Sequence, residues 1–303
     1  MISILEIDVA DKSVLVRADL DLPAGRQDSN RERATVEIIK YLREKKAERI
    51  KIIGHKGNIG MVEKFGVDVN FDLRADKREE ENSMELAQEL AQGFDVYVNE
   101  AFATSHRRHT SIVALPEFMK SQGKIVCGGL RFGKEIKILS SITPSPPLNL
   151  RWGKLLIVGG AKTLDKEKYA QDFEKNGWTV LRGGLLPNIK LRADGLDIST
   201  ETVANYKSQI ANAKIIVVAG PMGKYETQIP NPKSQIPKGG TYEVFKAIAE
   251  SNAYKIAGGG DTESALEEFG LSDKFDWISV GGGAMLEFLM TGTLPGIEAL
   301  TSQ

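Results

Sequence analysis

The segment LLIVGGAK at 155–162 decides the architecture, because it is a continuous apolar run that ends in a pair of glycines. Short runs of this kind, rich in β-branched residues, recur along the chain, and most end in glycine or a charged turn. Continuous rather than alternating apolar residues are typical of strands buried on both faces of a parallel sheet. The predicted strands are 14–16, 50–53, 96–98, 125–127, 155–158, 179–181, 215–218, 254–257 and 277–280.

Helical patterns separate these runs, at 35–45, 84–91, 166–176, 242–251, 262–269 and 284–290. Asn82 is predicted to cap the helix at 84–91, with Glu85 at the third helical position and Gly93 just beyond the end. A regular alternation of strand and helix predicts the α/β class, with doubly wound parallel sheets.

The length of the chain predicts about two such domains. It has 303 residues, and a domain usually takes ~100–200. A helical pattern at 134–142 is followed by a stretch rich in proline and serine at 143–147, which cannot continue the helix. We therefore expect one domain over 1–150 and a second over 151–290, followed by a tail at 291–303.

Composition excludes several classes of protein. Hydrophobic residues make up 41% and charged residues 27%, which is ordinary for a globular protein and unlike a disordered chain, collagen or a coiled coil. The net charge of −1 provides no overall basic field for nucleic acid. The single cysteine, Cys127, excludes a disulfide framework and a cysteine-based zinc site. No apolar stretch approaches the ~18–20 residues of a membrane helix, and the first residues do not resemble a signal peptide. We expect a cytoplasmic protein.

Glycine turns in the second half predict a phosphorylated ligand. They read GGAK at 159–162, GG at 183–184, GPMG at 220–223, GGGD at 258–261 and GGG at 281–283. Glycine lets backbone N–H groups approach a phosphate, and the following helix N-terminus favours negative charge. The alternative interpretation is that these glycines serve only the tight turns between strands and helices. Neither a P-loop nor a dinucleotide-binding G-x-G-x-x-G is present. Lys162 and Lys166 either neutralise phosphate or are solvated.

The first half has charged and polar residues after its strands instead. They are Arg17, Asp19, Asp21, His55, Lys56, Asn99 and Glu100, with Arg31, Arg74, Arg107 and Arg108 in predicted loops. Arginines and histidine near strand ends suit a small, multiply anionic substrate, although surface ion pairs explain the same spacing. His106 and His109 are spaced like a metal pair, but surface or hydrogen-bonding histidines account for them more simply.

Seven motifs, in order along the chain, resemble those of the phosphoglycerate kinase family. They read VLVRADLDLP at 14–23, VNEAFATSHRRHTS at 98–111, GGAKTLDK at 159–166, GPMGKYE at 220–226, GGGDT at 258–262, GGGAMLE at 281–287 and LPGIEAL at 294–300. The resemblance implies two α/β domains that face a cleft, joined by the helix at 134–142 and by a C-terminal tail that returns toward the first domain. It also implies a monomer that transfers a phosphoryl group between 1,3-bisphosphoglycerate and ADP in glycolysis, with magnesium and with a carboxyl group as acceptor.

The same resemblance implies roles for individual residues. Arg31, Lys162, Gly260 and Gly283 are implied to be catalytic. The residues implied to bind 3-phosphoglycerate are Asp19, Asp21, Arg31, His55, Asn58, Arg74 and Arg107. Those implied to bind the nucleotide, ATP or ADP, are Gly159, Gly160, Ala161, Lys162, Lys166, Gly183, Gly184, Gly220, Pro221, Glu226, Gly258, Gly259, Gly260, Asp261 and Thr262. Asp261 matches the aspartate that is linked to magnesium.

The chain also departs from the family pattern. It is shortened at 56–73 and at 185–196, and the second loss predicts weak discrimination among purine bases. Lys56 and Asn58 replace residues of the family's HLGR motif, and Asp21 and Ala219 each replace an asparagine. Arg182 replaces a glycine, where it either clashes or adds charge for a phosphate. A non-catalytic relative that binds a nucleotide or phosphometabolite, and a kinase for another small carboxylic acid, are the alternatives.

Overall fold

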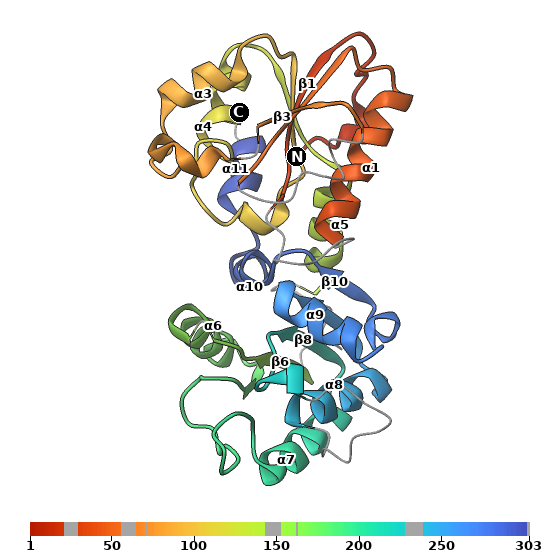
Figure 1. The fold of residues 1–303 in the computed structure, drawn as a ribbon, viewed down its shortest axis with the longest axis vertical. Helices are drawn as coiled ribbons and strands as arrows, with labels where there is room; N and C mark the ends of the chain where they lie inside the picture. Colours follow the sequence, from red (N-terminus) through yellow and green to blue (C-terminus); the bar gives the residue numbers. More distant parts are fainter. Residues whose placement is uncertain are drawn as a thin grey trace. The chain divides into compact units, whose positions relative to one another are not determined.

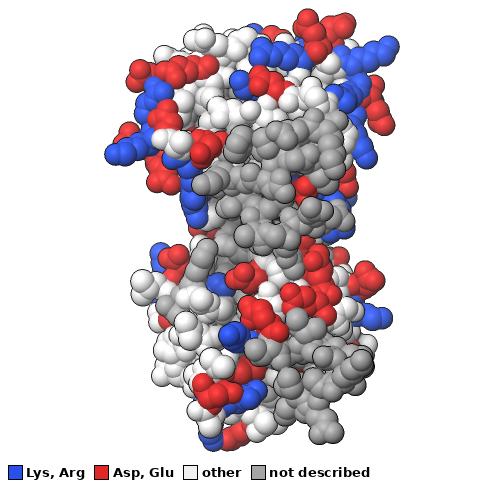
Figure 2. All heavy atoms as spheres, in the orientation of Figure 1, with Lys and Arg blue, Asp and Glu red and all other residues white. Residues whose placement is uncertain are grey.

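The computed structural model describes residues 1–20, 30–55, 65–70, 72–142, 153–161, 163–227 and 239–301 (Figure 1). The chain divides into two compact units. Unit 1 comprises Met1–Ser140 together with Thr291–Gln303, and unit 2 comprises Ser141–Met290. The segment after residue 290 therefore packs with the first half of the chain, from which it is far removed in sequence. Lys and Arg are interspersed with Asp and Glu on the visible face, in keeping with the net charge of −1 (Figure 2).

Unit 1 is built on a parallel sheet with the strand order β3-β2-β1-β4-β5. Its strands are β1 (Ser13–Arg17), β2 (Arg49–Ile53), β3 (Asp68–Asn70), β4 (Val96–Asn99) and β5 (Ile125–Gly128). In the central strand, Val14 pairs with Ile50 on one side and with Val96 on the other. All three side chains are buried, as the continuous apolar pattern requires.

Helices cover both faces of this sheet (Figure 1). They are α1 (Asn30–Glu44), α3 (Met84–Ala91), α4 (Ala114–Ser121), α5 (Leu130–Ser140) and α11 (Pro295–Thr301). Helices α1 and α5 pack together on one side, whereas α3 and α4 pack together on the other, with α11 against α4. Short 3-10 helices lie at η1 (Ile4–Glu6), η2 (Leu73–Ala75), η3 (Lys77–Glu79) and η4 (Phe102–Thr104).

Unit 2 repeats this architecture with the strand order β10-β9-β8-β6-β7, again all parallel. Its strands are β6 (Lys154–Val158), β7 (Thr179–Arg182), β8 (Ile215–Ala219), β9 (Tyr254–Gly258) and β10 (Trp277–Ser279). The helices are α6 (Thr163–Lys175), α7 (Thr200–Ala211), α8 (Gly240–Glu250), α9 (Gly260–Glu268) and α10 (Gly282–Thr291), with η6 (Tyr225–Thr227) and η7 (Ser272–Lys274). The core packs Tyr206 and Ile210 of α7 and Phe245 of α8 against buried strand residues such as Ile216 and Val218.

The predicted fold class is confirmed, since both units are parallel α/β sheets and each predicted strand is present. The sequence patterns missed β3, α4, α7 and α11, which are short or have a weak periodicity. The predicted cap at Asn82 is wrong. Ser83 caps α3 by accepting the N–H of Leu86, while Asn82 takes a left-handed φ of 56° and accepts the N–H of Ala114. Among the described helices, none is both long and apolar enough to cross a membrane.

Candidate functional site

In unit 1, polar side chains gather where β1, β2 and β4 end. Arg17 is the last residue of β1, and it pairs in register with Ile53 of β2 and Asn99 of β4. Because parallel strands end at the same edge of a sheet, the side chains that follow these three strands lie together. The Arg17 side chain is fully buried there, and its Nε donates to Ser111 Oγ at 2.9 Å.

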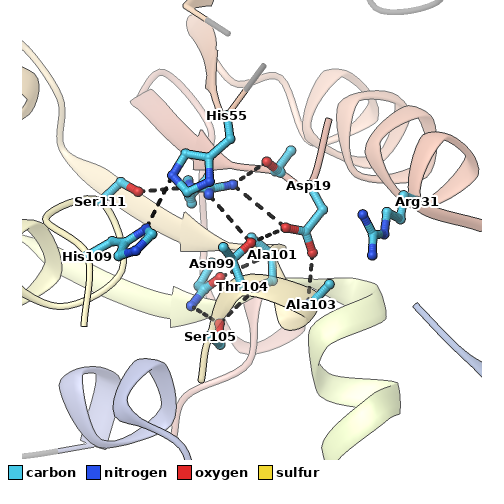
Figure 3. Close-up of polar contacts among 12 residues, drawn as sticks. Asp19, Arg31, His55, Asn99, Ala101, Ala103, Thr104, Ser105, His109 and Ser111 are labelled. Atoms are coloured by element: carbon cyan, nitrogen blue, oxygen red, sulfur yellow. Dashed lines mark hydrogen bonds and ion pairs between the residues drawn. The ribbon is translucent and has the colours of Figure 1, made fainter. Parts of the chain in front are cut away.

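Asp19 follows β1 and is held in place by the turn after β4. Its carboxylate accepts the N–H of Ala103 at 2.8 Å and the hydroxyl of Thr104, and it lies 3.9 Å from the Arg17 guanidinium. Arg31 extends from the first turn of α1 beside Asp19 (Figure 3). These contacts fix the Asp19 carboxylate as part of the wall of this site.

His55, two residues beyond β2, belongs to a buried cluster with Glu79 and His109. Nε2 of His55 lies 2.8 Å from Glu79 Oε1, and His109 Nδ1 lies 3.4 Å from the same His55 nitrogen. The rings of the two histidines are tilted, with centroids 5.1 Å apart (Figure 3). Ser111 completes the cluster, since its hydroxyl donates to Glu79 Oε1 at 2.6 Å and its N–H to Glu79 Oε2 at 3.0 Å.

Burial and the neighbouring groups together hold the histidines of this cluster neutral and its carboxyl group ionised. Burial lowers the pKa of His55, and the neighbouring Arg17 and Arg74 add to this against the opposing effect of Glu79. Burial, His55, Arg107 and Arg74 together lower the pKa of His109 to about 4, although Glu79 opposes them. Burial alone would raise the pKa of Glu79, but hydrogen bonds from His55 and Ser111 and the charge of Arg17 bring it below its usual value.

Two kinds of ligand can be considered for the cluster. The ligand atoms of His55, Glu79 and His109 lie within 4.8 Å of one another, which is compatible with a metal ion. However, the guanidinium groups of Arg17, Arg74 and Arg107 act on the same side chains, and their charge opposes a dication. The electrostatics therefore favour an anion. Of the two histidines spaced like a metal pair, His109 hydrogen-bonds to His55, in keeping with the simpler interpretation of it as a hydrogen-bonding histidine.

Arg74 and Arg107, which sequence reasoning placed in the same site, both influence His109 electrostatically. Both side chains are exposed, and Arg74 pairs with Glu80 at 3.4 Å. The structure thus brings Asp19, His55, Arg74 and Arg107 to one end of the sheet. Sequence reasoning missed Glu79 and gave no role to Ser111. Glu79 lies in a run of charged residues that looks solvated, and only its burial reveals it.

In unit 2, the glycine turns meet at the carboxyl edge of the sheet. A Cβ on Gly159 would collide with the carbonyl oxygen of Pro221, and one on Gly184 would collide with the backbone of Gly160. Gly220 combines such a close approach with a φ of 116°, which residues with a side chain rarely adopt. The turns after β6, β7 and β8 are therefore packed backbone to backbone. The turn after β9 joins them through Thr262, whose buried hydroxyl accepts the N–H of Gly220 at 2.8 Å.

Lys166 places its ammonium group over these turns. It comes from the first half of α6, donates to the carbonyl oxygen of Gly159, and would lie 2.6 Å from a Cβ on Gly220. A cation held against glycine backbone at the end of a sheet is suited to binding phosphate. Gly183 and Gly258 line the same edge, where Met222 and Met285 fill the space that a side chain would take.

Three further unit 2 candidates are exposed at or near this edge. Glu226 lies in η6, Asp261 in the first turn of α9, and Gly283 in the first turn of α10. Gly260 begins α9, so its N–H is among the helix donors without an intrahelical partner. The Asp261 carboxylate forms no hydrogen bond or ion pair with another described residue. An exposed carboxylate of this kind fits Mg²⁺, which prefers oxygen ligands.

Arg182 does not add charge for a phosphate. Its Nε lies 2.9 Å from Glu167 Oε2 and its Nη1 lies 2.5 Å from Glu174 Oε1, and both glutamates are on α6. These carboxylates raise the pKa of Arg182 and neutralise its charge. Nor does it clash, because ion pairs with α6 accommodate its side chain. The candidates Asp21, Asn58 and Lys162 lie outside the described residues.

Comparisons with known proteins agree across both units. A family model described as phosphoglycerate kinase matches residues 70–196 and 186–292. A phosphoglycerate kinase of Mycoplasmoides gallisepticum is 31% identical over 78% of this chain and 70% of its own length. One of Clostridium botulinum is 30% identical over 99% of this chain and 98% of its own, in an alignment of 409 positions that opens gaps in these 303 residues. The solved phosphoglycerate kinase from Pyrococcus horikoshii OT3 covers 99% of this chain and 98% of its own, with a TM-score of 0.79 at 24% identity.

Proposed function

The chain belongs to the phosphoglycerate kinase family, and on that premise we propose that it transfers a phosphoryl group between 1,3-bisphosphoglycerate and ADP. In reverse, ATP would phosphorylate the carboxylate of 3-phosphoglycerate. The observation that carries the proposal is the stack of glycine turns in unit 2, with the Lys166 ammonium held against Gly159 and Gly220. The second support is the cluster of arginines and histidines at the strand ends of unit 1, which suits an anionic acid.

The proposed reaction requires the protein to position the reactants and to stabilise the charge of the transferring group. A carboxylate nucleophile is already ionised at neutral pH, so the reaction needs no general base. Catalysis then consists of holding the reactants in line and stabilising the charge of the transferring group. Backbone amides, lysines and arginines do both, and the candidate residues of the two units include groups of each of these kinds.

Each group has a proposed task in this scheme. In unit 1, Asp19, His55, Arg74 and Arg107 would orient the acid, and Arg31 would meet the transferring group. In unit 2, Lys166 and the amides of Gly260 and Gly283 would stabilise the phosphates, with Glu226 binding the ribose. Mg²⁺ would be held by Asp261 and would supply further charge neutralisation.

A turnover assay tests the proposal. Purified protein with Mg²⁺, ATP and 3-phosphoglycerate should form ADP at a rate at least ~100-fold above that of an Arg31→Ala variant, since removing one transition-state cation costs about this much. No turnover above that variant would contradict the proposal. Calorimetry then separates the alternatives. Binding of ATP without binding of 3-phosphoglycerate would indicate a non-catalytic relative, and a screen of small carboxylic acids would reveal a different acceptor.

A further inference from the structure

Glu79 is a buried carboxylate beside the arginines and histidines of unit 1. Its side chain is fully buried at the end of η3, and both oxygens are occupied. Oε1 lies 2.8 Å from His55 Nε2 and accepts the Ser111 hydroxyl at 2.6 Å, while Oε2 accepts the Ser111 N–H at 3.0 Å. Burying an ionised carboxylate costs free energy unless the groups around it form hydrogen bonds to it and balance its charge.

The contact with His55 determines which ring nitrogen carries the proton. An ionised carboxylate only accepts hydrogen bonds, so the proton of neutral His55 lies on Nε2, toward Glu79. Nδ1 is then the position at which His55 can take a second proton. The other charged or titratable groups that act on this ring are Arg17, Arg74 and His109. Both arginines oppose that second proton as long as no anion is bound.

An anion bound beside these arginines reverses the balance. Its negative charge offsets Arg17, Arg74 and Arg107, and it provides an acceptor for a charged imidazolium. Glu79 then lies against one side of the ring as counter-charge. The two histidine rings lie 5.1 Å apart, so a charge on one disfavours a charge on the other. Glu79 is 2.8 Å from His55 but 3.8 Å from His109, so the proton goes to His55.

We propose, on the basis of the proposed function, that Glu79 is a positioning residue for the acid substrate. It orients the His55 ring through Nε2–H and supplies the counter-charge with which His55 takes up a proton as the anion binds. The proton comes from solvent and forms an N–H bond at Nδ1, and no other covalent bond forms or breaks. It returns to solvent when the anion leaves.

Calorimetric titration with 3-phosphoglycerate at pH 7.5, in buffers that differ in ionisation enthalpy, measures this proton directly. The slope of the observed enthalpy against the buffer enthalpy should approach ~1 proton taken up per site in the wild-type protein. In Glu79→Gln the slope should fall toward zero, and the affinity should fall by about 10- to 100-fold, because a charge-assisted hydrogen bond is lost. A merely structural role would weaken binding without changing the slope.

Two further variants make the result decisive. Glu81→Gln removes an exposed carboxylate nearby and should retain the wild-type slope. His55→Gln still donates to Glu79 but cannot take up a proton, so it should lose the slope even if Glu79→Gln fails to fold. Wild-type binding without proton uptake, or uptake that persists in Glu79→Gln or in His55→Gln, overturns this inference, whereas the proposed function is judged separately by the turnover assay. If the wild-type protein neither binds nor phosphorylates 3-phosphoglycerate, the proposed function fails, and this inference fails with it.

Discussion

Arg182 ends β7 beside the glycine pair at 183–184, yet its guanidinium is bound by Glu167 and Glu174 of α6. We therefore expect Arg182→Leu to affect stability rather than nucleotide binding. Urea unfolding should show a loss of about 1–3 kcal/mol, with the KM for ATP changed less than about threefold. Arg192→Leu is the matched control, since Arg192 forms an ion pair with the exposed Asp194 alone among the described residues and its loss should cost under ~1 kcal/mol. A large rise in KM for ATP in Arg182→Leu would show that this arginine reaches the phosphates after all.

For Lys166, in contrast, we expect a substitution to affect nucleotide binding rather than stability. Its ammonium group lies against Gly159 and Gly220, where the phosphates are proposed to bind. Lys166→Met should lower kcat/KM for ATP by about 10- to 100-fold, the cost of one hydrogen bond to a charged group. Lys168→Met, an exposed lysine of the same helix, should leave it unchanged. Equal effects in the two variants would mean that Lys166 contributes only to the general charge of α6.

At the scale of elements, Glu100, which follows β4, accepts hydrogen bonds from the first turn of helix α5. Its buried carboxyl group accepts the N–H of Arg131 at 2.7 Å and of Phe132 at 3.3 Å, and there is no room for a Cβ at Gly129 beside it. Burial raises the pKa of Glu100 to about 8, even though these N–H groups and the Arg131 charge lower it. The folded protein thus holds a proton that the unfolded chain releases at its ordinary pKa near 4.5.

The raised pKa of Glu100 makes the free energy of unfolding depend on pH. Between pH 4.5 and 8, unfolding releases the Glu100 proton, so this residue's contribution to the free energy of unfolding falls as pH rises. Urea unfolding of the wild-type protein and of Glu100→Gln across pH 5–8 should show the wild-type protein losing stability relative to the variant as pH rises. The exposed Glu117→Gln should keep the wild-type trend. A difference that is independent of pH would place the pKa of Glu100 outside this range.

The shortened segment at 185–196 is expected to affect how well the protein distinguishes one purine base from another. Leu185, Leu191 and Leu196 are exposed along it, and Asp197 anchors its end through the N–H groups of Ile198 and Gly240. A short segment with exposed leucines offers apolar contact to a base but few groups that distinguish one purine from another. We expect turnover with ATP and GTP to differ by less than about a hundredfold. A larger preference would mean that other residues read the base.

At the scale of the whole molecule, the two candidate sites lie in different units, and the proposed reaction needs both. No covalent phospho-enzyme is expected if, as proposed, the substrate carboxylate attacks the phosphate directly. Initial rates with both substrates varied should therefore give intersecting rather than parallel double-reciprocal lines. Exchange of label between ADP and ATP should be absent without 3-phosphoglycerate. Parallel lines, or exchange without the acid, would contradict direct transfer.

Much of the fold could be predicted from local patterns in the sequence. Buried parallel strands are apolar on both faces, so runs such as 155–158 were recognisable without any tertiary knowledge. The glycine turns were recognisable for a related reason, since only glycine fits where Gly159 and Pro221 meet. The motif resemblance identified Asp19, His55 and Lys166, which the structure places at the two sheet edges. Short elements such as β3 were missed because three residues carry too little periodicity.

Contacts between distant residues were decided only by the tertiary structure. Glu79 and Glu81 belong to the same run of charged residues, and folding alone buries the first against His55 and Ser111 and leaves the second exposed. The partners of Arg182 likewise depend on how α6 lies beside β7. Sequence determines which side chains can carry a charge or fit a turn. The fold decides which charges meet and lose their water, and therefore which of them can act on a ligand.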